Sequence, residues 1–359
     1  MNRMQRMKSQ RNSNLELYRI IVMLLIVAHH YVVNSGLIGQ MQSSPLTTNS
    51  VFLYLFGMWG KTGIDCFVLI TGYFMCKSKA TAAKFFKLLF EVMFYKIVIY
   101  LIFVATGVVT FTFTSFARAL IPISNVGDGF TTGFIFFYLF IPFINVLISH
   151  IDKSMHQKLI LLCLFIYTIW YMVPGYRVAY NYVTWFIVLY LISSYVRLYP
   201  FTRIKNKHWG YLSLLLIGIS AVSVIALRNM GYNNPFRLVA DSNAILALLT
   251  AFTTFMFFKD LQIKQSQFIN TVAASCFGVL LIHANSNAMR QWLWCDTLRN
   301  VEYLDSPYCA LHAITSVLVI YIICTLIDMI RIRFIERPFF NSAFYRLIDN
   351  KINRLLGVI

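Results

Sequence analysis

The chain has 359 residues, of which 59% are hydrophobic and 12% charged, and its formal net charge is +18. This composition excludes an ordinary soluble protein and indicates a protein that crosses a membrane many times. The positive charge does not indicate nucleic-acid binding, because the basic residues lie in short stretches between apolar runs. That pattern is typical of cytoplasmic loops, so membrane lipids are an expected partner and nucleic acid is not.

The apolar runs predict an all-α fold, a single bundle of about ten transmembrane helices. The expected spans are residues 15–33, 51–75, 86–107, 130–148, 158–173, 183–197, 210–227, 242–258, 271–289 and 311–333. Residues 1–14 and 334–359 would form basic tails on either side of a transmembrane domain at 15–333. The first apolar run lacks a small-residue cleavage site, so it is expected to be a span and not a cleaved signal peptide.

The loops between these spans differ in charge. Alternate loops and the two tails hold 22 of the 31 Lys and Arg residues, and the other loops hold six. Because Lys and Arg concentrate on the cytoplasmic side, both termini are predicted to be cytoplasmic. The outward loops are short, so we expect any chemistry to occur inside the bundle or at its two mouths.

The first span carries four ionisable side chains, Glu16, Arg19, His29 and His30, in an otherwise apolar run. A charge at the centre of a bilayer costs about 2.5–3.5 kcal/mol or more, so such groups are usually paired, placed in a cavity or functional. Arg19 and His30 are 11 residues apart, about three helical turns, so they share one face with roughly 16 Å between them. Glu16 is spaced to pair with Arg19. In the alternative interpretation, Arg19 and Glu16 lie at the interface and one histidine bridges two helices.

Two later spans place polar groups at the depth of the first-span histidines. Lys61 and Asp65 are four residues apart, so either they pair with each other or one of them contacts the imidazole or a substrate. His283 lies in the outer half of the ninth span, and Asn285 and Arg290 follow toward the mouth. A lone membrane histidine is usually a packing residue, but three polar clusters at one depth favour a functional site.

Histidine is suited to acyl transfer, because its unperturbed pKa near 6.5 lets it take a proton from an attacking hydroxyl and release it later. Arg19, near the cytoplasmic mouth, is suited to an anionic donor such as a coenzyme A thioester, since guanidinium groups bind phosphate well. Lys84 and Lys87 in the first cytoplasmic loop would add to this attraction, although most such loops only set topology.

The seven cysteines include two, Cys295 and Cys309, in the last outward loop, where an oxidising environment allows a disulfide. The other five lie in or beside apolar spans and are predicted to be packing residues. Cys and His show no metal-ligand spacing, so no metal is expected. The sequence contains no nucleotide-binding motif, which excludes an ATP-driven transporter for this chain alone.

Four sequence elements occur in a fixed order. Arg19 and His30 enclose ten residues, GIDCFVLITGY occupies 63–73, CFGVLLIHANS occupies 276–286 and ERPFF occupies 336–340. In these elements the chain resembles the acyltransferase-3 family, integral-membrane enzymes that O-acylate cell-surface sugars. The resemblance covers nearly the whole chain, and ten spans with both ends inside is also the family's architecture.

The resemblance implies an O-acetyltransferase of the bacterial inner membrane. The donor would be cytoplasmic acyl-coenzyme A, usually acetyl-coenzyme A, with succinyl as an alternative acyl group. The acceptor would be a sugar hydroxyl of a surface polysaccharide, an exopolysaccharide or a lipid-linked glycan, with polysaccharide-biosynthesis proteins as partners. The resemblance also implies that His30 is the catalytic histidine, as general base or as carrier of the acyl group, and that Arg19 is its companion.

Seven further residues complete the predicted site. Asp65 and His283 are catalytic candidates, Lys84 and Lys87 are donor contacts together with Arg19, and Lys61, Asn285 and Arg290 are substrate contacts. The chain departs from the family pattern at Cys66, where phenylalanine is usual, and at Thr71, where serine is usual. Its first cytoplasmic loop carries lysines where the family often has arginines, and lysines bind phosphate as point charges.

A transporter or flippase for a sugar–lipid intermediate is the alternative, since it would share the many spans and the buried charges. It predicts pseudo-symmetric halves with matching Gly or Pro breaks, and Pro122, Pro142 and Pro174 show no such recurrence. A glycan polymerase or ligase is a third interpretation, and it would usually need a larger outward loop.

Overall fold

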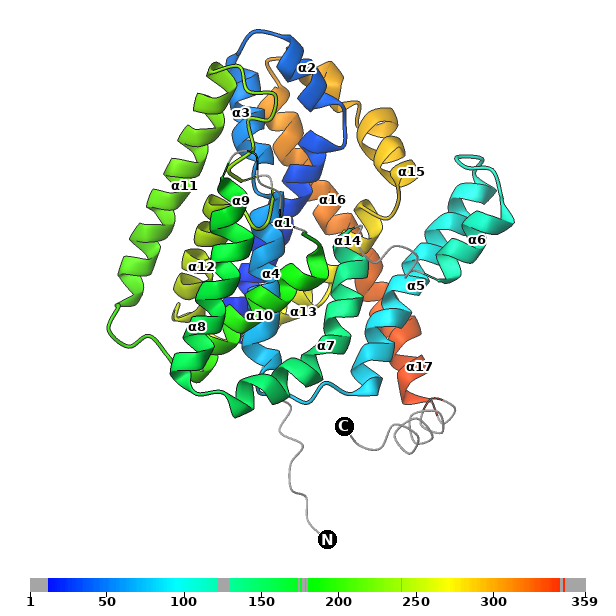
Figure 1. Ribbon diagram of the computed structural model, residues 1–359. Coiled ribbons are helices and arrows are strands. Elements are labelled where there is room, and N and C mark those ends of the chain that lie inside the picture. The colour runs from blue at the N-terminus through cyan, green and yellow to red at the C-terminus, as the bar shows by residue number, and fades with distance from the viewer. Residues whose placement is uncertain are drawn as a thin grey trace.

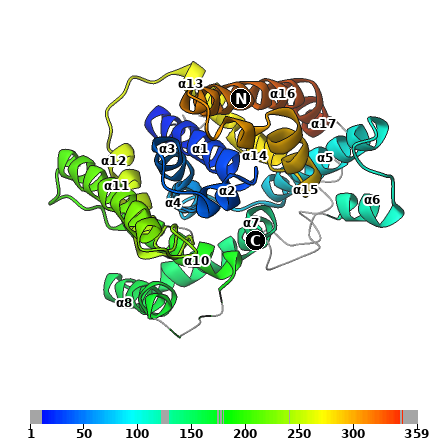
Figure 2. The ribbon, with the colours of Figure 1, turned by 90° about the horizontal axis from the view of Figure 1, so that it is seen from above.

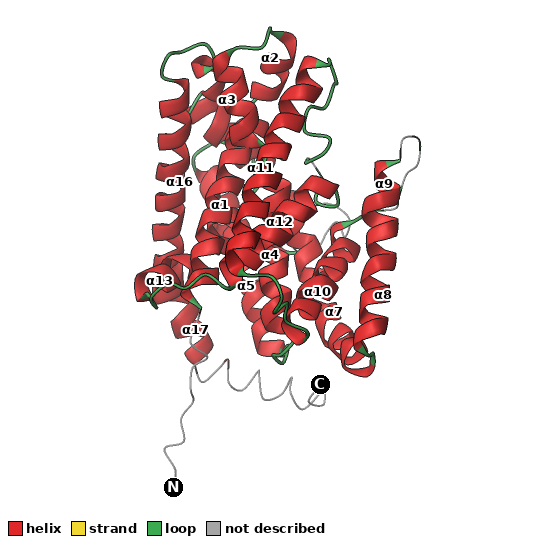
Figure 3. Ribbon diagram, turned by 90° about the vertical axis from the view of Figure 1, so that its left-hand side faces the viewer, coloured by secondary structure: helices red, strands yellow, loops and turns green. Residues whose placement is uncertain are grey.

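The computed structural model describes residues 12–121, 129–173, 175, 178, 180–239, 241–342 and 345. Every regular element in this described part is a helix (Figure 3), so the all-α prediction is confirmed. Residues 1–11 of the predicted N-terminal tail, most of the predicted C-terminal tail, Pro122 and Pro174 lie outside the described residues.

Each predicted span falls on one helix or on two or three consecutive helices. The main helices are α1 (Ser13–Val33), α3 (Thr48–Gly57), α4 (Gly60–Met75), α5 (Ala82–Ala105), α7 (Phe130–His150), α8 (Lys153–Leu164), α10 (Tyr182–Leu198), α11 (Asn206–Asn229), α12 (Ile245–Lys259), α13 (Gln267–Ala274), α14 (Cys276–His283) and α16 (Cys309–Arg331). Short helices lie between or after them: α2 (Leu37–Ser43), α6 (Phe113–Leu120), α9 (Trp170–Met172), α15 (Asn287–Arg290) and α17 (Arg337–Asn341).

Seven helical segments of the described chain are long and apolar enough to cross a membrane. An eighth is obtained if the pair Gln267–His283 and Asn287–Tyr303, bent by 94°, is one broken span. α10 and α12 are apolar but shorter. The protein is therefore a multi-pass membrane protein, while the count of ten spans and the side of the termini stay predictions.

α1 lies in the interior of the bundle, where it packs against α3, α4, α12, α13, α14 and α16 (Figures 1 and 2). Its apolar side chains are buried on several faces, and Val27, Tyr31 and Val32 are fully buried. The polar groups of α1 are therefore held among other helices and cannot reach lipid freely, which is the setting in which ionisable membrane residues are usually functional.

The second predicted span is broken between α3 and α4. A capping box at Thr47 starts α3, and the helix stops at Gly57, before Met58 and Trp59. Gly60 restarts the helix against α1, where a Cβ atom would lie 2.2 Å from the His29 ring. Only glycine therefore fits this close approach of α4 to α1.

A buried ion network joins the last span to α5. Arg331 of α16 is 2% exposed and forms ion pairs with Asp328 at 2.8 Å, Glu336 at 2.7 Å and Glu91 of α5 at 3.0 Å. Lys87 adds a 2.6 Å ion pair to Glu336. Glu336 is the first residue of the ERPFF element, and the described residues after α16 continue as helix through Asn341, while the assignment of residues 334–359 to a cytoplasmic tail stays a prediction.

We expect Gly278→Ala to destabilise the protein. A Cβ atom at Gly278 would lie 2.2 Å from Asp328 Oδ1, which accepts hydrogen bonds from Tyr95 and Arg331 at 2.8 Å each. The added methyl must displace this carboxylate, at a cost of about 1–3 kcal/mol. Thermal unfolding in detergent measures the effect, with Gly218→Ala as the control because nothing lies within 4 Å of its Cβ position. Equal unfolding temperatures for the two variants would contradict the packing argument.

Candidate functional site

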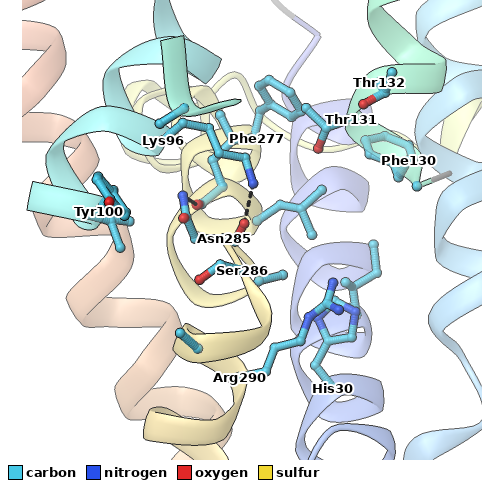
Figure 4. Close-up of a pocket in the computed structure, with 18 of the residues that line it drawn as sticks. His30, Lys96, Tyr100, Phe130, Thr131, Thr132, Phe277, Asn285, Ser286 and Arg290 are labelled. Carbon is cyan, nitrogen blue, oxygen red and sulfur yellow. Dashed lines mark hydrogen bonds between the residues drawn. The ribbon is translucent and has the colours of Figure 1, made fainter. Parts of the chain in front are cut away.

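A cavity of about 670 Å³ opens beside the second half of α1 (Figure 4). Its wall is formed by the second halves of α1, α5 and α14, by α15, and by the first residues of α4, α7 and α10. All of these segments belong to the same end of the bundle, the end at which α1 finishes. The predicted clusters of the first, second and ninth spans therefore share one cavity, to which His30, Lys61, Asn285 and Arg290 contribute.

His30 is held by a chain of hydrogen bonds that fixes its tautomer. His283 Nδ1 lies 2.6 Å from the carbonyl oxygen of Val279, and its Nε2 lies 2.9 Å from His30 Nδ1. Since a carbonyl oxygen only accepts, Nδ1 of neutral His283 carries the hydrogen and its Nε2 is an acceptor. His30 therefore donates from Nδ1, and its Nε2 keeps a lone pair on the side of the ring not used by His283.

His29 has a different role in the same cavity wall. Its Nδ1 lies 2.5 Å from the carbonyl oxygen of Gly57, at the end of α3. This bond satisfies a carbonyl group that the break between α3 and α4 leaves without a helical partner. His29 is thus the histidine that bridges two helices, as the alternative interpretation of the first span required. His30 does not serve this contact.

The cavity has an apolar end. Met23 and Ile26 of α1, Ile64 and Phe67 of α4 and Phe277 of α14 line it. These residues lie closer along their helices to the end of the bundle where α1 begins. Met23 is only one helical turn from Arg19, so the apolar end approaches the mouth at which Arg19 lies.

The other end of the cavity is cationic. Lys61 donates to the Tyr182 hydroxyl at 2.6 Å, and Lys96 of α5 donates to the backbone carbonyl oxygen of Asn285. Arg290 extends toward His30 in Figure 4 and donates to the Asn287 side chain at 3.2 Å. Arg118 of α6 also lines the wall of this end.

The ion pair between Lys61 and Asp65 that the spacing allowed does not form in the structure. Lys61 is bound to Tyr182, and Asp65 is fully buried, where its Oδ1 accepts from the Trp185 indole at 2.9 Å. Asp65 does not line the cavity, because its side chain turns to the face of α4 that packs on α10. Its Oδ2 is buried and has no hydrogen-bond partner among the described residues, and its catalytic role stays a prediction.

Glu16 and Arg19 form the predicted ion pair, at 3.3 Å. Arg19 does not line the cavity, and neither do Lys84 and Lys87. Lys87 is bound to Glu336, and Lys84 donates to the backbone carbonyl oxygen of Lys79 at 2.8 Å. The donor contacts proposed for these three residues therefore stay predictions.

The cavity residues that the sequence did not predict include Lys96, Arg118 and Tyr182. Lys96 had a usable signal, since it is a lone lysine inside an apolar span, like Lys61. Arg118 and Tyr182 had none, because only the tertiary structure brings α6 and the start of α10 to the wall of the cavity.

Two further expectations concern cysteines and metals. Cys295 and Cys309 are both free in the structure, and Cys295 donates to the carbonyl oxygen of Asn34. Within the described residues, no group of three or more His, Cys, Asp and Glu side chains is arranged to hold a metal ion.

The sequence profile of the acyltransferase-3 family, described as an acyltransferase domain, matches residues 12–329. The chain therefore belongs to the acyltransferase-3 family and is a membrane acyltransferase. No curated protein and no solved structure shows significant similarity to the chain. Family membership favours an enzyme over the transporter and polymerase alternatives, and it agrees with a histidine held by hydrogen bonds in a cavity.

The predicted topology places this cavity at the outer face, which thiol labelling can check. Thr131→Cys lines the cavity at the start of α7, whereas Thr250→Cys, 2% exposed inside the bundle, is the matched control. In a Cys295→Ser background, we expect a membrane-impermeant maleimide added to whole cells to label only the first variant. If Thr131→Cys is labelled only in inside-out vesicles, the cavity opens to the cytoplasmic face and the predicted orientation is wrong.

Proposed function

We propose that this protein is an O-acyltransferase that moves an acyl group, most simply acetyl, from acyl-coenzyme A to a sugar hydroxyl. The observation that carries the proposal is the hydrogen-bond chain from Val279 through His283 to His30. It supplies an oriented, unprotonated Nε2 beside a cavity with an apolar and a cationic end. Such an oriented base is what acyl transfer to a hydroxyl requires.

In the proposed step, His30 Nε2 takes the proton of the acceptor hydroxyl as its oxygen attacks the thioester carbonyl carbon. The new C–O bond forms, the C–S bond breaks, and the imidazolium returns the proton to the coenzyme A sulfur. His283 acts as a positioning residue, because its Nε2 accepts the Nδ1 hydrogen of His30 throughout. An acyl-His30 intermediate would use the same lone pair as a nucleophile, and the same tautomer serves both routes.

The apolar end of the cavity supports entry of the donor from the side of Arg19. Met23 and Phe67 offer a surface for the acyl and pantetheine parts, and Arg19, Lys84 and Lys87, which do not line the cavity, are the proposed contacts for the phosphates outside it. Arg19 is part of an ion pair with Glu16, so phosphate binding there would exchange one anionic partner for another.

We propose the acceptor class from the resemblance to the family. We place the reaction in a bacterial inner membrane, on a surface polysaccharide, an exopolysaccharide or a lipid-linked glycan, beside the proteins that build it. The cationic end of the cavity, with Lys61, Asn285 and Arg290 in its wall, would receive this acceptor.

We expect His30→Ala to lower acyl transfer by about 10²–10⁴-fold, the usual contribution of a general base. Inside-out membrane vesicles given acetyl-coenzyme A labelled in the acetyl group would show the loss of label from the glycan and glycolipid fraction. The control is His29→Gln, which retains a donor for the Gly57 carbonyl group and should transfer label at a rate close to that of the wild type. Unchanged transfer by His30→Ala at equal protein amount would contradict the mechanism.

The role of His283 gives a second test. His283→Leu removes the acceptor for His30 Nδ1–H, so the ring can adopt the wrong tautomer, and we expect kcat to fall about 10²-fold with little change in either KM. His283→Gln offers an amide oxygen in the same region and should recover part of this loss. If both variants only reduce the amount of folded protein in the membrane, and kcat per folded molecule is unchanged, His283 is a packing residue and not a positioning residue.

A further inference from the structure

The charge of the cavity wall is unbalanced. Lys61, Lys96, Arg118 and Arg290 line it, and none of the described lining residues is Asp or Glu. A positive surface is expected in a protein with 31 Lys and Arg residues against 13 Asp and Glu. Four cations around one cavity inside a helical bundle are costly and need a separate explanation.

Among the described residues, these four cations have no carboxylate partner. Lys61 and Lys96 donate to a hydroxyl and to a backbone carbonyl oxygen, and Arg290 donates to an amide oxygen. The Nε atom of Arg290 is buried and has no hydrogen-bond partner. Arg331, by contrast, is matched by three carboxylates on the other side of α5.

Unpaired cations in a site of low dielectric constant repel one another, and their charge is stabilised when an anion enters between them. Arginine supplies a planar fork that matches carboxylate and phosphate oxygens, and the free Nε of Arg290 is part of that fork. A site built for a neutral sugar would be expected to contain carboxylate and amide side chains that bind hydroxyl groups. The wall of this cavity therefore fits an anionic ligand better than a neutral one.

We propose that the acceptor is an anionic glycan, with a phosphate or carboxylate group close to the hydroxyl that receives the acyl group. This inference rests on the proposed acyl transfer and specifies its acceptor. The phosphates of coenzyme A are the other source of such an anion. The position of two of these cations favours the acceptor. Arg290 extends toward His30 in Figure 4, and Lys61 lies in the first turn of α4 beside Tyr182, whereas Arg19 lies about three helical turns from His30 along α1.

The first test analyses the natural product. Membranes of the host are given labelled acetyl-coenzyme A, and the labelled glycan is degraded to its repeating oligosaccharide and applied to an anion-exchange column. We expect the labelled oligosaccharide to be retained, through a charged group on the acylated sugar or its neighbour. A neutral labelled oligosaccharide overturns this inference and leaves the acyl transfer established. No label in any glycan contradicts the acyl transfer itself, and this inference with it.

The second test uses the same oligosaccharide, freed of its ester by mild alkali, as the acceptor in kinetics. We expect Arg290→Gln and Arg118→Gln each to raise the KM for this acceptor about tenfold and to leave the KM for acetyl-coenzyme A unchanged. Arg290→Lys keeps the charge and should recover part of the loss. The matched control is Arg237→Gln, an exposed loop arginine that does not line the cavity.

Two kinetic outcomes would overturn the assignment. If the KM for acetyl-coenzyme A rises in Arg290→Gln and Arg118→Gln while that for the acceptor does not, the cations bind the phosphates of the donor. If the wild type prefers succinyl-coenzyme A and Arg290→Gln loses this preference, the cations bind the acyl group.

Discussion

The structure depends on how polar groups are held among apolar helices. A buried charge is costly, and it is tolerated where opposite charges or hydrogen bonds compensate for lost water. Most of this chain follows that rule: three carboxylates surround Arg331, the Trp185 indole holds one oxygen of Asp65, and Glu16 pairs with Arg19. The cavity beside α1 departs from it, since its cations find only neutral partners in the described residues. Among the described arginines and lysines, the contrast is between Arg331, which three carboxylates hold in the fold, and the cations of the cavity wall, which have no carboxylate partner.

The same distinction separates the two neighbouring histidines of α1. His29 and His30 are adjacent in sequence and both contribute to the cavity, yet the fold uses them differently. His29 satisfies the last carbonyl group of α3 and lies against Gly60, so moving it would disturb the break between two helices. Within the part of the chain that the structure describes, His30 is hydrogen-bonded only to another histidine, which orients its ring and leaves one nitrogen available. A base must be oriented and still free to accept a proton, and only His30 meets both conditions.

The sequence predicted the helices of a multi-pass membrane protein because a long apolar run between charged loops has few alternatives to a membrane helix. It also singled out His30 and His283, which are conspicuous in apolar surroundings and which the fold brings within 2.9 Å of each other. It did not predict the partners of these groups. The spacing of Lys61 and Asp65 allowed an ion pair, but Tyr182 and Trp185, both on α10, provide the partners that the fold uses. Local spacing permits a contact, and packing decides whether it forms.

The shape of the cavity gives a reason for placing the base near the end of α1. A donor with an apolar arm and an acceptor with charged groups differ in the surroundings they require, and the two ends of the cavity offer these surroundings separately. His30 lies on α1 between Met23 at the apolar end and the end of the helix, with Arg290 extending toward it from α15 (Figure 4). Two substrates that approach from opposite ends can meet only at such a residue. In the proposed reaction, a donor made on one side of the membrane would thereby reach an acceptor on the other, and neither substrate would have to cross the bilayer.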